Sequence, residues 1–150
     1  MRTHTLTTLL LCLLSPLTFA HDKSQEIIHH NLPAHAESGL PFSSAVQVGH
    51  TLYLSGSLGN KPGTTDLVPG GIAAETRQTM ETIKGMVEAF GSSMDRVVKC
   101  TVFLADMTEW PAMNEVYRTY FTKMPARSAF GANGLALGAR VEIDCIAIVE

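Results

Sequence analysis

The chain has 150 residues, of which 45% are hydrophobic and 17% are charged, and its formal net charge is −3. This length suits one domain with a single buried core. The acidic balance excludes binding to a nucleic-acid backbone as the main activity, because no excess of Lys and Arg is present to displace counterions.

The first twenty residues have the pattern of a secretory signal peptide. Arg2 supplies the basic start, residues 9–14 are apolar, and Ala20 ends a segment with small residues at the cleavage positions. The apolar run is too short to span a bilayer. A short buried core helix is the alternative interpretation. The pattern predicts a signal peptide over 1–20, export to a periplasmic or secreted location, and no membrane segment in the mature form.

Residues 21–44 are polar and irregular, since Pro33 and Pro41 interrupt any helix there, and residues 21–38 are predicted to form an irregular N-terminal arm. The folded domain is expected to cover residues 39–150. Three of the histidines in the arm, His29, His30 and His35, lie close together in the chain. Joint capture of a metal ion is one interpretation of these histidines, but a solvated arm is preferred, so no metal site is predicted.

After the arm, alternating and helical patterns predict seven elements. In chain order they are strands at 45–48 and 51–55, a helix at 72–90, a strand at 97–104, a helix at 109–121, and strands at 126–130 and 140–149. Gly49-His50 suits a type II′ hairpin turn between the first two strands. Both helices have one apolar face, so they are predicted to pack on one face of a mixed β-sheet. The expected class is α+β, with the order β-β-α-β-α-β-β.

The last predicted strand changes character along its length. Glu142 and Asp144 occupy the same face that Ile146 and Ile148 occupy further on. A strand face that is half acidic and half apolar suits a surface shared with another subunit.

Two cysteines, Cys100 and Cys145, remain after the predicted signal, and each lies in an apolar, β-branched run. The preferred interpretation is two buried thiols that act as small hydrophobic side chains. A disulfide stays open as the alternative, because exported proteins can form one and the sequence does not reveal the separation of the two Cα atoms.

Arg127 and Glu142 are the residues best suited to binding and catalysis. Small neighbours on a short strand leave room around the Arg127 guanidinium, whose fixed fork of donors matches a carboxylate. Glu142 lies between two apolar residues, where partial burial would raise its pKa toward the range useful for acid–base catalysis. From spacing alone, a simple ion pair between the two, or two solvated side chains, is the preferred alternative.

Further motifs occur along the chain in a recognisable order. They are Tyr53-Leu54-Ser55-Gly56, Thr76-Arg77-Gln78-Thr79, Lys99 to Asp106, Met113 to Tyr117 with Tyr120-Phe121, and Pro125-Ala126-Arg127-Ser128 followed by Leu135 to Ile146. Together they resemble the RidA/YjgF family over residues 39–149.

The resemblance implies a chorismate-mutase-like fold, assembled as a homotrimer with sites in the clefts between subunits. It also implies hydrolysis of reactive enamines or imines, such as 2-aminoacrylate, to a 2-keto acid and ammonia, without a cofactor or metal. By position, Arg127 would hold the substrate carboxylate, and Glu142 would position the attacking water and move a proton. The residues implied to bind the substrate are Phe42, Ser55, Gly56, Asn114 and Ala129.

Three features depart from the family pattern. Phe42 stands where deaminating members usually have Tyr, Ser57 stands where Gln commonly follows the Ser-Gly pair, and export is unusual for this family. A second hypothesis is therefore a non-catalytic trimer that binds small carboxylates as a sensor or scavenger. The acidic balance and export argue against a third, endoribonuclease, activity.

Overall fold

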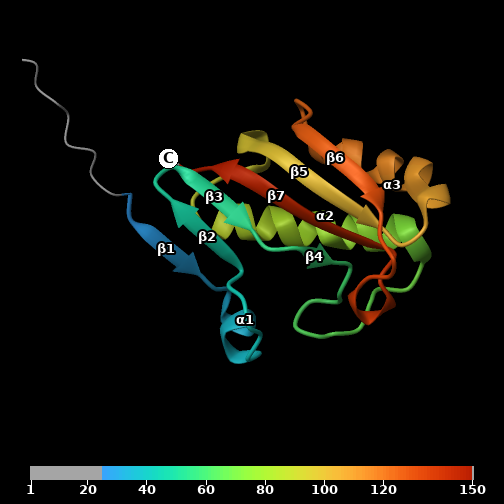
Figure 1. Ribbon diagram of the computed structural model, residues 1–150, viewed down its shortest axis with the longest axis horizontal. Coiled ribbons are helices and arrows are strands. Elements are labelled where there is room, and N and C mark those ends of the chain that lie inside the picture. The colour runs from blue at the N-terminus through green and yellow to red at the C-terminus, as the bar shows by residue number, and fades with distance from the viewer. Residues whose placement is uncertain (1–24, 150) are drawn as a thin grey trace, which may run out of the picture.

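One mixed sheet of seven strands organises the molecule, and helices cover the face of the sheet that points away from the viewer in Figure 1. The computed structural model describes residues 25–149. The predicted signal peptide and its cleavage site lie outside these residues. Within the described range, no helix combines the length and the apolar character needed to cross a membrane.

The sheet and the helices follow the predicted chain order, with two elements added before the first predicted strand and one short strand added after the hairpin. The strands are β1 (Ile27–His30), β2 (Ala45–Val48), β3 (Thr51–Leu54), β4 (Ser57–Leu58), β5 (Val97–Leu104), β6 (Ala126–Gly131) and β7 (Val141–Ile148). The helices are α1 (Pro33–Glu37), α2 (Gly71–Ala89) and α3 (Trp110–Tyr117), and short 3-10 turns are η1 (Met94–Arg96), η2 (Met107–Glu109), η3 (Arg118–Tyr120) and η4 (Ala136–Gly138).

The strand order is β1-β2-β3-β7-β5-β6, and β4 also pairs with β7. Only β5 and β6 run parallel; the other pairs are antiparallel. The β2–β3 hairpin turns at Gly49 with a φ of 57°, while His50 keeps a negative φ. A positive φ at the first turn position alone fits the predicted type II′ turn. Both helices predicted from sequence pack on one face of the sheet, as expected (Figure 1).

The N-terminal arm is more ordered than the sequence suggested. Residues 27–30 form β1, which pairs with β2 and extends the sheet, and α1 follows directly. Pro33 does not prevent α1 because it sits in the first turn, where its missing N–H has no helical partner in any case. Each arm histidine has its own polar contact: His29 Nδ1 with Ser43 Oγ, His30 Nε2 with Gln47 Oε1, and His35 Nε2 with the carbonyl oxygen of Phe42.

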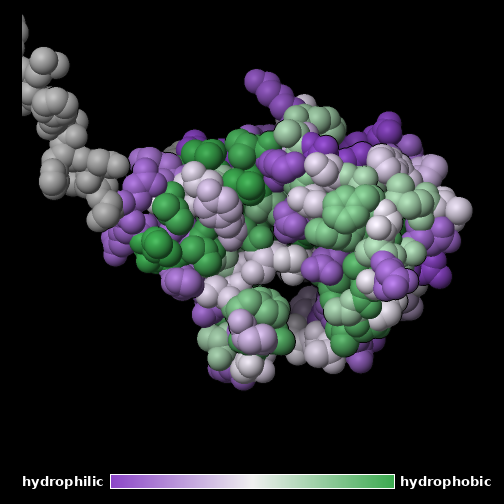
Figure 2. Space-filling model, in the orientation of Figure 1, coloured by the Kyte–Doolittle hydropathy of each residue, from purple (hydrophilic) through white to green (hydrophobic). Residues whose placement is uncertain are grey.

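The two faces of the sheet differ in burial. Along β7 the odd-numbered residues, Val141 to Ala147, are buried against the helices, and the even-numbered residues are only partly buried. The register puts Phe103, Phe130 and Tyr53 on the same side as those even-numbered residues. We call this side the open face. Figure 2 shows apolar surface gathered on it over β1 to β3 and the adjoining end of β7.

The preferred interpretation of the two cysteines was wrong. Cys100 of β5 and Cys145 of β7 form a disulfide with a Cα–Cα separation of 4.1 Å. The two residues are direct partners in the antiparallel β5–β7 register, which brings their side chains together on the buried face. Composition shows that both cysteines sit in apolar strands, but it does not show this register.

Replacing both cysteines by Ala is expected to lower the free energy of unfolding by about 2–4 kcal/mol, because the crosslink restricts the unfolded chain. It joins residues 45 positions apart and lies in the core. Urea titration of the oxidised protein and the double variant measures the difference. Equal midpoints, together with two titratable thiols in denatured wild type under non-reducing conditions, would contradict the disulfide.

Candidate active site

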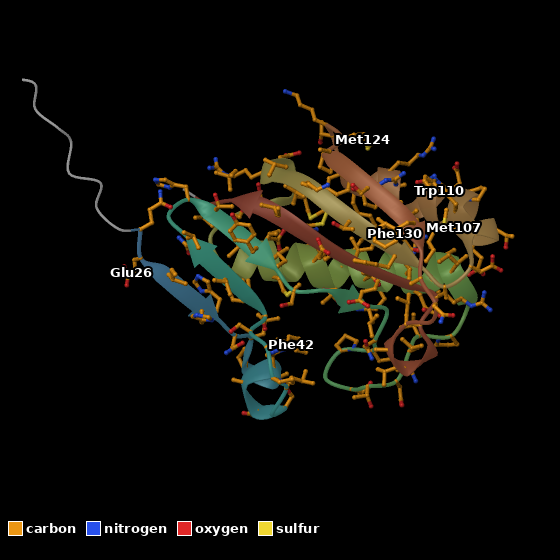
Figure 3. All side chains as sticks on the ribbon, viewed as in Figure 1. Glu26, Phe42, Met107, Trp110, Met124 and Phe130 are labelled. Atoms are coloured by element: carbon orange, nitrogen blue, oxygen red, sulfur yellow. A yellow bond between two sulfur atoms is a disulfide. The ribbon has the colours of Figure 1, made fainter. Side chains whose placement is uncertain are left out.

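Arg127 lies on β6 and turns its side chain toward α3, on the helix-covered side of the sheet. Its Nη1 donates a hydrogen bond of 2.6 Å to Asn114 Oδ1. The guanidinium carbon lies 4.8 Å from the ring centre of Tyr117 and 5.7 Å from that of Trp110, which is labelled in Figure 3. Residues 110, 114 and 117 recur at helical spacing, so α3 presents all three to the same guanidinium.

The guanidinium is held in place without being neutralised. Within residues 25–149 no carboxylate forms an ion pair with Arg127, so the simple ion pair with Glu142 that the sequence favoured is not formed. Burial raises the pKa of Tyr117 to about 12, although the charge of Arg127 opposes the shift, so the ring stays neutral beside it. A fixed, positively charged fork with donors to spare is a suitable receptor for a carboxylate ligand.

Glu142 lies on the open face of β7, with its carboxylate over Gly56. A Cβ atom on Gly56 would lie 3.0 Å from Glu142 Cδ and closer still to Oε1, so only glycine leaves room for this carboxylate. Burial, and secondly the nearby charge of Asp144, raises the pKa of Glu142, in the direction expected from its apolar neighbours. A carboxylate with a raised pKa is better able to accept and return a proton near neutral pH.

Replacing Gly56 by Ala is expected to displace the Glu142 carboxylate and lower kcat for the proposed reaction by roughly tenfold or more, with little change in stability. The change is confined to the end of a flexible side chain, because the nearest atoms all belong to Glu142. Gly85→Ala is the control, since Gly85 is exposed, has no positive φ, and a Cβ there meets nothing within 4 Å. An unchanged kcat in Gly56→Ala would show that the position of this carboxylate does not matter.

Phe42, Ser55 and Gly56 gather at one cleft of about 850 Å³. The cleft is bounded by α1, β4, the loop at 59–65 and η4. Ser55 Oγ donates to the carbonyl oxygen of Ser43 at 2.7 Å, which ties the end of β3 to the segment that carries Phe42. Figure 3 shows Phe42 beside α1, on the side of the molecule where this cleft opens.

The predicted site residues therefore fall into two groups. Arg127, Asn114 and Ala129 form the first group, which lies between β6 and α3, and Ala129 packs against the core. The second group comprises Glu142, Gly56, Ser55 and Phe42, on the open face and at the cleft. We call these the arginine group and the glutamate group.

The register shows that one chain does not join the two groups. Arg127 pairs with Cys100, which pairs with Cys145, so these three side chains share one face. Glu142 is three residues from Cys145 and therefore points to the opposite face. The offset amounts to about 10 Å along the strands and about 10 Å across two strand spacings. A single copy thus carries two half-sites that face different directions.

Sequence reasoning missed two features of these half-sites. It predicted only an apolar face for the helix, whereas the rings of Trp110 and Tyr117 contact the Arg127 guanidinium. Their spacing with Asn114 was the available signal. It also did not connect His35 with Phe42, whose rings lie 5.0 Å apart.

Comparisons with known proteins agree with this architecture. The model of the family described as Endoribonuclease L-PSP matches residues 33–149. The chain is 44% identical over 109 residues to the 2-iminobutanoate/2-iminopropanoate deaminase of Mus musculus, covering 72% of this chain and 81% of that protein.

Solved structures show the same fold. The crystal structure of yeast YEO7 has a TM-score of 0.78 and 34% identity, covering 83% of this chain and 100% of that one. RidA from an Antarctic Psychrobacter has a TM-score of 0.71 and 34% identity, covering 85% of this chain and 99% of that one.

Proposed function

The chain belongs to the family described as Endoribonuclease L-PSP, the RidA/YjgF family, and from this membership we propose that it hydrolyses reactive imines and enamines to 2-keto acids and ammonia. The observation that carries the proposal is the pair of half-sites: a fixed guanidinium without a carboxylate partner in the described chain, and a carboxylate with a raised pKa beside Gly56. The substrate is a small imine and not a nucleic acid.

For hydrolysis of an imine, the protein needs to orient the substrate and to transfer protons. Arg127 binds the substrate carboxylate through two parallel N–H donors. Glu142 takes a proton from a water molecule as the water oxygen bonds to C2 of the imine, and passes this proton to the imine nitrogen as the C2–N double bond becomes single. Glu142 then takes the hydroxyl proton of the resulting carbinolamine and delivers it to the amine nitrogen, so that the C2–N bond breaks, C2 becomes a carbonyl and ammonia leaves. An enamine such as 2-aminoacrylate enters this sequence after its β-carbon is protonated.

A homotrimer with a cleft between neighbouring copies would combine the two half-sites. The arginine group of one copy would face the glutamate group of the next, giving three equal sites. The half-acidic, half-apolar open face supports this assembly, because Tyr53 and Phe130 leave nearly half of their surface exposed there in one copy.

The proposal includes export of the protein from the cytoplasm. The pattern of residues 1–20 supports a signal peptide. The Cys100–Cys145 disulfide supports it independently, since such bonds persist in oxidising compartments. The protein would then remove reactive imines outside the cytoplasm, in the periplasm or after secretion.

The direct test supplies freshly generated 2-aminoacrylate and follows the release of keto acid and ammonia above the spontaneous rate. The proposal expects acceleration that saturates with substrate. The alternative, a non-catalytic binder, draws on Phe42, which lacks the phenol of deaminating relatives. Calorimetric binding of keto acids that depends on Arg127, without acceleration of any imine, would favour that alternative.

A further inference from the structure

The cleft beside Gly56 is far larger than the smallest substrate needs. Its volume of about 850 Å³ lies in the range of pockets that hold drug-sized ligands, about 300–1,000 Å³. A three-carbon imino acid has six non-hydrogen atoms and would fill only a small part of the cleft. Most of the cleft would therefore stay unfilled by such a substrate and has room for a larger group.

The lining of the cleft is mainly apolar. Six large apolar side chains contribute to it: Leu32, Leu40, Phe42, Leu58, Met86 and Leu137. Among its described lining residues, Lys61 alone carries a full charge, and Lys61 faces Asp66 at 4.0 Å. This lining favours an aliphatic or aromatic group over an acidic one.

Two of these apolar side chains, Leu137 and Phe42, are held exposed at the cleft by the local backbone and by contacts with His35. Leu137 is 57% exposed and has a φ of 58°, in the left-handed region that leucine rarely adopts. Phe42 is 49% exposed, and His35 fixes it through a 2.6 Å hydrogen bond to its carbonyl oxygen and a ring contact. Backbone strain and exposed apolar area both cost free energy, and neither is offset by packing within the described chain.

We propose that this cleft binds the side chain of the substrate and selects imines of amino acids with larger apolar side chains, such as branched aliphatic or aromatic ones. The inference rests on the proposed function, because it uses the position of Glu142. Gly56 is part of the cleft wall and contacts the Glu142 carboxylate, so a substrate with C2 at this carboxylate can extend its side chain into the cleft.

The test compares kcat/KM for imines generated in situ by an amino-acid oxidase from Ala, Leu, Phe and Glu, each corrected for spontaneous hydrolysis. The expected kcat/KM is roughly tenfold or more higher for the Leu and Phe imines than for the Ala imine, since each buried methylene strengthens binding. A higher value for the Ala or the Glu imine overturns the inference and leaves deamination standing. Failure to hydrolyse any imine would instead overturn the proposed function.

Two variants locate the preference in the cleft. Leu137→Gly removes a rim side chain and also relieves the positive φ, so the fold is retained. Leu40→Ser removes a second exposed apolar group. Each is expected to lower the ratio of the Leu-imine to the Ala-imine kcat/KM several-fold. Met124→Ser is the matched control, because Met124 is 59% exposed but lies outside the cleft and should leave the ratio unchanged.

Other occupants of the cleft would give different results. If residues 1–24 or a second copy of the chain fill it, the Leu137 and Leu40 variants would change the oligomeric mass or the stability and leave the substrate ratio unaltered. Either result overturns the inference. Mass photometry or light scattering on the same samples distinguishes these outcomes from a change in selectivity.

Discussion

Replacing Arg127 by Ala is expected to lower kcat/KM for imine hydrolysis by about 10²- to 10⁴-fold, because two charge-assisted hydrogen bonds to the substrate carboxylate are lost. The loss should be felt by every imine with a carboxylate, whatever its side chain. Initial rates with freshly generated 2-aminoacrylate, at substrate concentrations well below KM, measure it directly.

A lysine at this position separates the effect of charge from that of geometry, and a second arginine provides the control. Arg127→Lys keeps the charge but loses the planar fork and its contact with the α3 rings, so it should recover only part of the activity. Arg118→Ala is the control, because Arg118 is an exposed arginine at the C-terminal end of α3, and its ion pair among the described residues is with Glu115. Arg127→Ala retaining wild-type kcat/KM would remove Arg127 from the site.

Replacing Glu142 by Gln is expected to lower kcat by about 10²- to 10⁴-fold, because the amide can neither accept nor return the proton. The pH profile gives a second check. Since burial and Asp144 raise the pKa of Glu142 above the ordinary value of 4.5, the acid limb of kcat/KM in wild type should lie above that pH. The residual activity of Glu142→Gln should lack this limb.

The same substitution is expected to leave stability unharmed. The folded-state pKa of Glu142 is higher than the unfolded one, so the folded protein binds more protons between the two values and loses stability as pH rises through that window. Glutamine has no such titration. The unfolding midpoint of Glu142→Gln relative to wild type should therefore rise as the pH increases above the ordinary glutamate value of 4.5. A large loss of stability at pH 8 would instead indicate a structural role for this carboxylate.

Much of the fold follows from local patterns in the chain. The 97–104 strand, the hairpin at Gly49 and the long helix were all predictable, because their periodicity, β-branched residues and turn glycine act within a few residues. The sequence did not indicate β1, and it left the disulfide as the less favoured alternative. Both depend on which strand lies beside which, and strand pairing joins residues far apart in the chain.

The candidate site, like the fold, could be predicted only in part from the sequence. Arg127 and Glu142 were recognisable as residue types in the right motifs, and the raised pKa of Glu142 followed from its apolar neighbours. Their placement on opposite faces did not follow, because it depends on the β5–β6 and β5–β7 registers taken together. That placement puts the two residues in separate half-sites, which is the reason for proposing that a second copy of the chain completes the site.

The central claim is that each site combines Arg127 of one copy with Glu142 of another. Co-expression of Arg127→Ala and Glu142→Gln chains with different affinity tags, followed by purification through both tags, tests it. Each variant alone should be nearly inactive. In a trimer that contains both chains, one of the three sites would join an intact arginine group to an intact glutamate group, so about a third of wild-type activity should return. Mixed assemblies that contain both chains and stay as inactive as either variant would contradict the account.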